Sequence, residues 1–271
     1  MIINVNDFSL DRTLNSGQIF AFFKRDNNWY SFLDKPLEIR QEGDKLVYSG
    51  LNESEIKELL GLNDPIDEIK AEIDKDDFID KAILYSGFLR VVNGGLWSTT
   101  LSFILSIQSN IELIKRRIMA MSDFYGKTGE VNGVQLKSFP SFEAIYSKGY
   151  ETLKQFKLGF RTKFVFSAAS YFYSHEMNEL LGIEDISKRL LEIGGIGEKV
   201  LDCIKLYGLH DLSAFPMDVW ILRTLSLHYN HIIGKYKSYK DKRKAMVDYF
   251  GMYAGYAQLF IYDYSRLNSI K

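Results

Sequence analysis

Cysteine and proline are scarce in this chain of 271 residues. Its one cysteine, Cys203, excludes an internal disulfide and an iron–sulfur cluster held by four cysteines. No uninterrupted apolar run of about eighteen residues is present, which argues against a membrane span. The N-terminal stretch MIINVNDFSLDR lacks the basic and apolar regions of a secretory signal. Together with only four prolines and no low-complexity tract, these absences predict a compact intracellular protein.

The net charge of −1 does not mark the chain as a nucleic-acid binder, but the charges are unevenly distributed. Residues 64–80 hold eight acidic side chains against two lysines, and residues 235–244 hold six basic side chains against one aspartate. Either segment can be a solvated linker. A protein that acts on DNA needs only a basic face, because phosphate contacts rather than total charge set its electrostatic affinity.

Short alternating or aromatic-rich runs, separated by turn signals, occupy the first fifty residues. They predict an antiparallel meander with strands at 19–23, 29–33, 37–39 and 45–48. Helical structure is expected from about residue 52, and helical periodicity dominates beyond about residue 76. The predicted class is α+β, with a small antiparallel sheet domain over residues 1–75 and a larger helical domain over 76–271.

The segment from Leu191 to Leu225 carries the most informative pattern, because a glycine turn separates two apolar stretches that suit short helices. Gly194, Gly195 and Gly197 leave the turn with little side chain, so its backbone can approach a partner closely. The first N–H groups of the second helix then point outward and can bind an anion. For a helix-hairpin-helix of this kind, the natural anion is a nucleic-acid phosphate.

Lys199 follows this turn, and Asp218 lies nineteen residues further on. Cleavage of an N-glycosidic bond gives the sugar C1′ oxocarbenium character, which a carboxylate stabilises. An unprotonated amine that attacks C1′ forms a covalent intermediate and then a Schiff base. The dipole of the predicted helix disfavours the charged form of an amine in its first turn. Alone, each residue has a structural explanation, which for Asp218 is a helix N-cap. Together, behind this hairpin, they predict catalysis.

This segment resembles the helix-hairpin-helix-Gly/Pro/Asp motif of base-excision DNA glycosylases. LNSGQIF at 14–20 and GMYAGYAQ at 251–258 are similar to segments of 8-oxoguanine DNA glycosylases with lyase activity, and the likeness covers nearly the whole chain. It implies a sheet domain like the TATA-binding protein, duplex DNA containing 8-oxoguanine as partner, and action as a monomer without a required cofactor. It makes Lys199 the nucleophile and Asp218 its electrostatic and proton-transfer partner.

The same resemblance assigns four residues to the extruded base. The Gly17 carbonyl would accept the N7–H that 8-oxoguanine has and guanine lacks. Gln258 would bond the Watson–Crick edge, and Tyr262 and Cys203 would cover the two faces of the base, in place of the stacking lost on extrusion. Without the family, Gly17 is an ordinary turn glycine, and Tyr262 and Cys203 are core residues.

Two further segments are implied to contact DNA. IQSNI, which begins at Ile107, resembles the loop that invades the gap in the duplex, and FKLGFR resembles a segment whose aromatic wedges beside the orphan base and whose arginine reads it. With the hairpin backbone, the implied DNA-binding residues are Gln108, Asn110, Phe160, Arg161, Gly195 and Gly197.

Two positions depart from the family. Leu113 replaces an arginine that contacts the orphan cytosine in eukaryotic members, which predicts relaxed selectivity for the base opposite the lesion. Trp220 replaces the usual histidine two residues after the aspartate, which predicts a weaker or different contact to the 5′ phosphate of the lesion. In the hairpin, the carbonyls of Leu191, Ile193 and Ile196 match those that hold a structural monovalent or divalent cation in related proteins, and carbonyl oxygens suit a hard ion.

Two other functions fit parts of this pattern. An alkylated-purine DNA glycosylase shares the hairpin and the aspartate but activates water, so Lys199 argues against it. A non-catalytic helix-hairpin-helix module would use the hairpin only to bind phosphate, which leaves Lys199, Asp218 and Gln258 unexplained.

Overall fold

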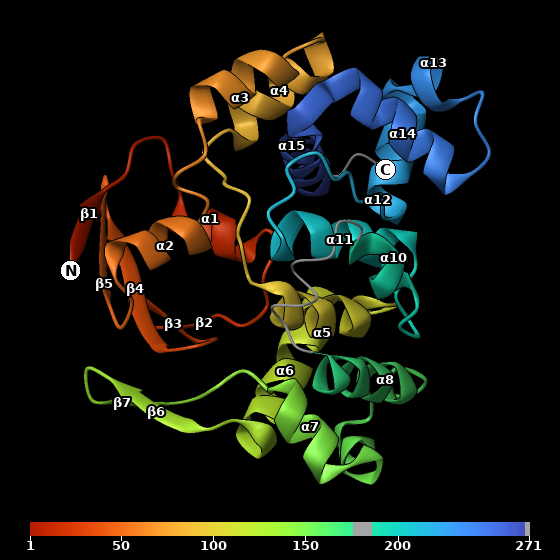
Figure 1. Cartoon of the computed structure of the whole chain (residues 1–271). Helices are drawn as coiled ribbons and strands as arrows, with labels where there is room; N and C mark the ends of the chain where they lie inside the picture. Colours follow the sequence, from red (N-terminus) through yellow and green to blue (C-terminus); the bar gives the residue numbers. More distant parts are fainter. Residues whose placement is uncertain (176–185, 269–271) are drawn as a thin grey trace.

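The structure, a computed structural model, describes residues 1–175 and 186–268. Figure 1 shows an antiparallel sheet on one side of the molecule and a larger body of helices beside it, so the predicted α+β class is confirmed. No helix within the two described ranges is long and apolar enough to cross a membrane. The domain boundary between residues 75 and 76 stays a prediction.

Five antiparallel strands form the sheet in the order β1-β5-β4-β3-β2. Their bounds are β1 Ile2–Asn4, β2 Phe23–Arg25, β3 Asn28–Phe32, β4 Pro36–Glu42 and β5 Lys45–Ser49. Leu37 and Ile39 of β4 are buried and pair with Ser31 and Trp29 of β3, which are buried too. This spacing of two places one face of the sheet in the core.

The predicted strand at 19–23 is wrong over residues 19–22, because β2 begins only at Phe23. Ile19, Phe20 and Phe22 are all buried, so this stretch does not alternate between a core face and a solvent face as a half-exposed strand does. Phe20 instead packs edge-on against Phe103 of the helical body. The aromatic residues that suggested a strand thus anchor an irregular connection.

Two strand features were not predicted. β1 is only three residues long and pairs with β5 at the edge of the sheet. A second sheet, made of β6 (Thr128–Val131) and β7 (Val134–Lys137), interrupts the region predicted to be helical. Its turn, Asn132-Gly133, is a strong hairpin signal that helical periodicity around it obscures.

The helices are α1 Leu10–Asn15, α2 Glu53–Leu59, α3 Ile66–Ile73, α4 Asp77–Ser86, α5 Leu96–Ser106, α6 Ile111–Tyr125, α7 Phe142–Lys148, α8 Arg161–Ser174, α10 Ile186–Leu191, α11 Glu198–Gly208, α12 Val219–His228, α13 Asn230–Ile233, α14 Tyr239–Phe250 and α15 Ala254–Leu267, with 3-10 turns η1 Tyr150–Phe156 and η2 Gly251–Tyr253. The Tyr207 carbonyl near the end of α11 accepts hydrogen bonds from Gly94 (2.8 Å) and Thr99 (3.2 Å) around the start of α5. These contacts show that α5 and α11 run in opposite directions. The start of α11 therefore lies at the same end as the loop that follows α5.

The acidic segment 64–80 is not merely a solvated linker. Four tyrosines near the C-terminus donate hydrogen bonds to three of its carboxylates: Tyr256 to Asp64, Tyr253 to Glu68, and Tyr229 and Tyr249 to Asp76. Burial and the neighbouring Asp76 raise the pKa of Tyr249 to about 12, which keeps this hydroxyl a donor. The acids therefore tie α3 and α4 to the C-terminal helices.

Asp76 makes the largest number of these contacts, since it also caps α4 by accepting from Phe78 (2.9 Å) and Ile79 (3.1 Å). Asp76→Ala should lower the free energy of unfolding by about 2 kcal/mol, because it removes an N-cap and leaves tyrosine hydroxyls without an acceptor. Urea denaturation measures the change. Asp74→Ala removes an exposed acid two residues away and should change stability little; equal losses for the two variants would contradict this assignment.

Candidate active site and DNA interface

The glycine hairpin connects α10 to α11 and packs against α8. Gly195 has a φ of +92°, and a Cβ there would lie 2.5 Å from the Phe164 ring, so this position requires glycine. Gly197 has open space around it and is exposed. At Gly195 the hairpin backbone thus closely approaches α8 of the same protein. The backbone at Gly197 is accessible to a partner. A DNA contact at either glycine stays a prediction.

Lys199 is the second residue of α11, whose N-cap, Gly197, offers no side-chain hydrogen bond to the first N–H groups. The Lys199 Nζ lies 5.0 Å from the centre of the Phe103 ring on α5, and the side chain is half-buried. The negative face of an aromatic ring attracts a cation. Phe103 therefore helps to hold the amine at the junction of α5 and α11.

Asp218 is the N-cap of α12, and its Oδ1 accepts the N–H of Ile221 at 2.8 Å. The cap that offered a structural explanation for this aspartate is therefore present. It uses one carboxylate oxygen and orients the other. Trp220 lies in the first turn of the same helix and is 40% exposed, so its indole is accessible to a partner.

Lys199 and Asp218 both affect the pKa of the buried Cys203 thiol. Burial raises the pKa of Cys203 to about 11, Lys199 lowers it and Asp218 raises it. Asp218 also adds to the raised pKa of Tyr207 and of Tyr262, for each of which burial is the main cause. The amine and the carboxylate thus both influence the same thiol, and within the described part of the chain no hydrogen bond or ion pair joins them: Lys199 contacts Phe103, and Asp218 contacts Ile221.

Gly17 brings the N-terminal region to this cluster. Its φ is +88°, and a Cβ there would lie 3.9 Å from the Tyr262 hydroxyl on α15. Gln18 holds the turn in place, since its side-chain amide donates to the Arg90 carbonyl (2.9 Å) and accepts from the Val92 N–H (3.0 Å). Two of the predicted base-binding residues, separated by most of the sequence, are therefore neighbours.

Gln258 and Tyr262 are one turn apart on α15, as Lys199 and Cys203 are on α11. The Tyr207 hydroxyl of α11 donates to the Gln258 Oε1 at 3.2 Å and joins the two helices. This bond occupies the oxygen of the Gln258 amide, while the amide nitrogen makes no hydrogen bond within the described residues. All four predicted base-binding positions therefore lie around one junction of α11, α15 and the turn after α1.

The predicted DNA-invading residues lie in two neighbouring loops. Asn110 is the N-cap of α6 and accepts the N–H of Leu113 at 2.9 Å, while Gln108 is exposed. Phe160 is 45% exposed at the start of α8. Arg161 is buried, and its guanidinium donates to the backbone carbonyls of the Gln108 loop rather than facing solvent. The role of this arginine in reading the orphan base stays a prediction.

The hairpin offers a mixed fit to the predicted cation. Of the three carbonyls, that of Ile193 already accepts the N–H of Ile196 at 3.1 Å, whereas those of Leu191 and Ile196 accept none within the described residues. No group of three or more His, Cys, Asp or Glu side chains among the described residues could hold a metal. A cation here would therefore depend on backbone carbonyls, and its presence stays a prediction.

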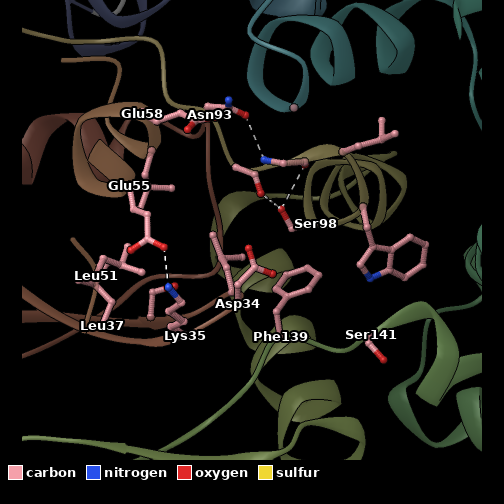
Figure 2. Close-up of a pocket in the computed structure, with 18 of the residues that line it drawn as sticks. Asp34, Lys35, Leu37, Leu51, Glu55, Glu58, Asn93, Ser98, Phe139 and Ser141 are labelled. Atoms are coloured by element: carbon pink, nitrogen blue, oxygen red, sulfur yellow. Dashed lines mark hydrogen bonds and ion pairs between the residues drawn. The ribbon is translucent and has the colours of Figure 1, made fainter. Parts of the chain in front are cut away.

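A cleft of about 720 Å³ between the sheet and the helices lies away from these residues (Figure 2). It borders Gly208 at the far end of α11, roughly 13 Å along the helix axis from Lys199. Asp34, Glu58 and Glu143 line it, and Lys35 there is paired with Glu55 at 2.6 Å. Carboxylates repel a phosphate backbone, so this lining does not favour DNA.

The structure adds Gln18, Phe103 and Tyr207 to the candidate site, none of which was given a role from the sequence. Gln18 lies within the recognised SGQ segment, so its neighbours could have drawn attention to it. Phe103 and Tyr207 stack on each other, with ring centres 5.7 Å apart. Both fall on apolar helix faces, where nothing local distinguishes a site residue from a core residue.

The thiol of Cys203 should be inert in the folded protein, because it is buried and its pKa is raised from 9.0 to about 11. Disulfide exchange with an aromatic disulfide reagent at pH 8 measures this directly, since the chain has one cysteine. Native protein should react slower than urea-unfolded protein by a factor of at least about one hundred. Comparable rates would show that the thiol is not enclosed.

Known proteins share both the N-terminal region and the whole fold. Residues 1–99 match the family described as "8-oxoguanine DNA glycosylase, N-terminal domain". The chain is 25% identical to the N-glycosylase/DNA lyase of Saccharomyces cerevisiae, over 95% of this chain and 83% of the yeast protein. It is 26% identical to a probable N-glycosylase/DNA lyase of Methanothermobacter thermautotrophicus, over 100% of this chain and 97% of that protein.

Solved structures of DNA glycosylases share the fold of this chain. The 8-oxoguanine glycosylase/lyase of Clostridium acetobutylicum, bound to duplex DNA with cytosine opposite 8-oxoguanine, superposes with a TM-score of 0.88 at 26% identity and covers 99% of this chain and 98% of that one. A 3-methyladenine DNA glycosylase from Archaeoglobus fulgidus has a TM-score of 0.78 at 20% identity over 99% of both chains, which shows a shared fold alone. Residues 1–99 thus match the N-terminal domain of 8-oxoguanine DNA glycosylases, and the chain is similar over nearly its whole length, in sequence and in fold, to N-glycosylase/DNA lyases.

Proposed function

We propose that the protein removes 8-oxoguanine from duplex DNA in base-excision repair and then cleaves the strand by β-elimination. The observation that carries this proposal is the position of Lys199 at the start of α11, with its Nζ 5.0 Å from the centre of the Phe103 ring and one turn before the buried Cys203, whose pKa Asp218 also affects. An amine, a carboxylate and an uncharged thiol that could contact a base thus meet beside a helix start that can bind phosphate. The protein acts as a monomer and needs no cofactor for this chemistry.

In the proposed reaction, the Lys199 Nζ attacks C1′ as the bond from C1′ to N9 breaks; the base leaves with the bonding electron pair and takes up the proton that the attacking amine loses. The Asp218 carboxylate stabilises the positive charge that develops on the sugar. Ring opening gives a Schiff base between Lys199 and C1′. Loss of the C2′ proton then expels the 3′ phosphate, and hydrolysis of the Schiff base frees the lysine.

Discrimination between 8-oxoguanine and guanine falls to Gly17. Its carbonyl would accept the N7–H of 8-oxoguanine, whereas guanine presents a bare N7 that repels it. Gln258, whose amide nitrogen is uncommitted, would bond the Watson–Crick edge of the base. Tyr262 and Cys203 would lie against its two faces, and the un-ionised thiol that burial enforces suits contact with an aromatic ring.

The nucleophile can be tested by chemical trapping. Borohydride reduces a Schiff base to a stable amine, so the wild-type protein should become covalently linked to DNA containing 8-oxoguanine. Lys199→Gln should abolish the trapped complex, while Lys205→Gln, on the same helix and paired with Asp211 at 2.9 Å, should retain it. A trapped complex that persists in Lys199→Gln would remove the nucleophile assignment.

Selectivity for the opposite base depends in part on position 113. With Leu113, excision should proceed at similar rates opposite all four bases, as a single-turnover nicking assay measures. Leu113→Arg should raise the preference for cytosine about tenfold, because an arginine that bonds a base edge is worth about 1–3 kcal/mol of discrimination. Glu112→Arg adds a cation at the exposed neighbouring position and should leave the ratio unchanged. A strong cytosine preference in the wild type would contradict the relaxed selectivity.

An alkylated-purine glycosylase would share this fold, so the fold cannot decide between the two substrates. Lys199 argues for the lyase, because an enzyme that activates water needs no amine beside C1′. Excision from 3-methyladenine duplexes without excision from 8-oxoguanine duplexes would overturn the proposed function. Binding of lesion DNA with no cleavage of either kind would instead indicate a non-catalytic DNA-binding module.

A further inference from the structure

Two loops that carry the predicted DNA-invading residues are both strained. Gln108 has a φ of +49° and Lys157 a φ of +50°, in the left-handed region that residues with a Cβ adopt rarely. The first lies in the loop between α5 and α6, and the second lies in the turn between η1 and α8. Such conformations persist only where the surrounding structure holds them.

Arg161 holds the first loop. Its Nε donates to the Ile107 carbonyl at 2.7 Å, and its Nη2 donates to the Gln108 carbonyl at 2.8 Å. Its Nη1 donates to the Leu158 carbonyl of the second loop at 3.2 Å. The guanidinium therefore lies buried between the two strained loops and satisfies their carbonyls.

Arg117 of α6 also bonds both of these loops. Its Nη1 donates to the Ser109 hydroxyl at 3.2 Å, and its Nη2 donates to the Lys157 carbonyl at 3.5 Å. Within the described residues, neither Arg117 nor Arg161 is paired with a carboxylate. Burial lowers the pKa of each guanidinium, and Arg117 lowers that of Arg161 further, which places two like charges close together.

We propose that Arg117 is a positioning residue that couples the loop at 107–110 to the turn at 157–160, so that both enter the DNA together. The proposal rests on the proposed function. The gap-filling residues and the wedge at Phe160 approach the same orphan base, so their relative position decides how well that base is held. Arg117 sets this position by bonding both loops, and its uncompensated charge favours the arrangement when DNA phosphates are near.

The test compares Arg117→Met with Arg116→Met. Arg116 is the adjacent residue of α6, is exposed, and makes no hydrogen bond or ion pair within the described residues, so its loss removes the same charge without touching either loop. Single-turnover excision of 8-oxoguanine is measured opposite each of the four bases. A 2-aminopurine next to the orphan base reports unstacking by its fluorescence.

Arg117→Met should slow excision about tenfold to a hundredfold, since misplaced groups cost rates of this order, and should reduce the fluorescence rise. Arg116→Met should change neither beyond the loss that one charge causes in DNA binding at low salt. Arg117→Lys keeps the charge but cannot reach two acceptors in a fixed geometry, so it should remain slow. Ser109→Ala removes one acceptor and should slow excision less, with little further effect in the Arg117→Met background.

Equal behaviour of Arg117→Met and Arg116→Met would overturn the proposal, as would full activity of Arg117→Lys. Either result would mean that only the positive charge of Arg117 matters and not its hydrogen bonds to the two loops. If Arg117→Met unfolds, Ser109→Ala and Arg117→Lys still decide. Failure of this proposal can be distinguished from failure of the proposed function. A wild-type protein that does not excise 8-oxoguanine would contradict the proposed function, whereas excision with no difference among the variants would contradict only the role of Arg117.

Discussion

The candidate active site depends on how closely α5 and α15 approach α11. A Cβ at Gly208 would lie 3.0 Å from Thr99 of α5, and a Cβ at Gly255 would lie 2.3 Å from the Leu206 side chain of α11. Both contacts lie near the end of α11 that is remote from the hairpin. Because helices are rigid, the spacing set there determines where the other ends meet. The junction that holds Lys199 beside Phe103 follows from packing roughly two turns away.

The side of the molecule proposed to face DNA is organised differently. Its loops are short and strained, and the carbonyls of Ile107 and Gln108 accept hydrogen bonds from the guanidinium of Arg161. This arrangement concentrates positive charge beside backbone that has little regular structure to support it. A polyanion is the partner for which such a surface is suited, even in a chain whose net charge is −1. The hairpin is joined to the same region, because Gly195 packs on Phe164 of α8, one turn after Phe160.

Local patterns were informative where the physics is local. The glycine hairpin, the cap at Asp218 and the helix after about residue 52 were all readable, since each depends on residues within a few positions of one another. The acidic segment 64–80 could not be interpreted in the same way. Its carboxylates are bound by tyrosines far along the chain, and no periodicity links Asp76 to Tyr229 or Tyr249. The strand predicted at 19–22 was wrong for a related reason. Phe20 in this stretch packs on Phe103 of α5, a helix far away in the sequence.

The amino-acid sequence by itself determined the chemical groups: a lysine in the first turn of a helix, an aspartate at the start of another, and the segments that resemble those of 8-oxoguanine DNA glycosylases. Only the tertiary structure decided which of these groups share an environment. The approach of Gly17 to Tyr262, the bond from Tyr207 to Gln258, and the bridging of two loops by Arg117 all join residues that are distant along the chain. Such contacts are set by helix packing in three dimensions, for which a linear sequence carries no local signal.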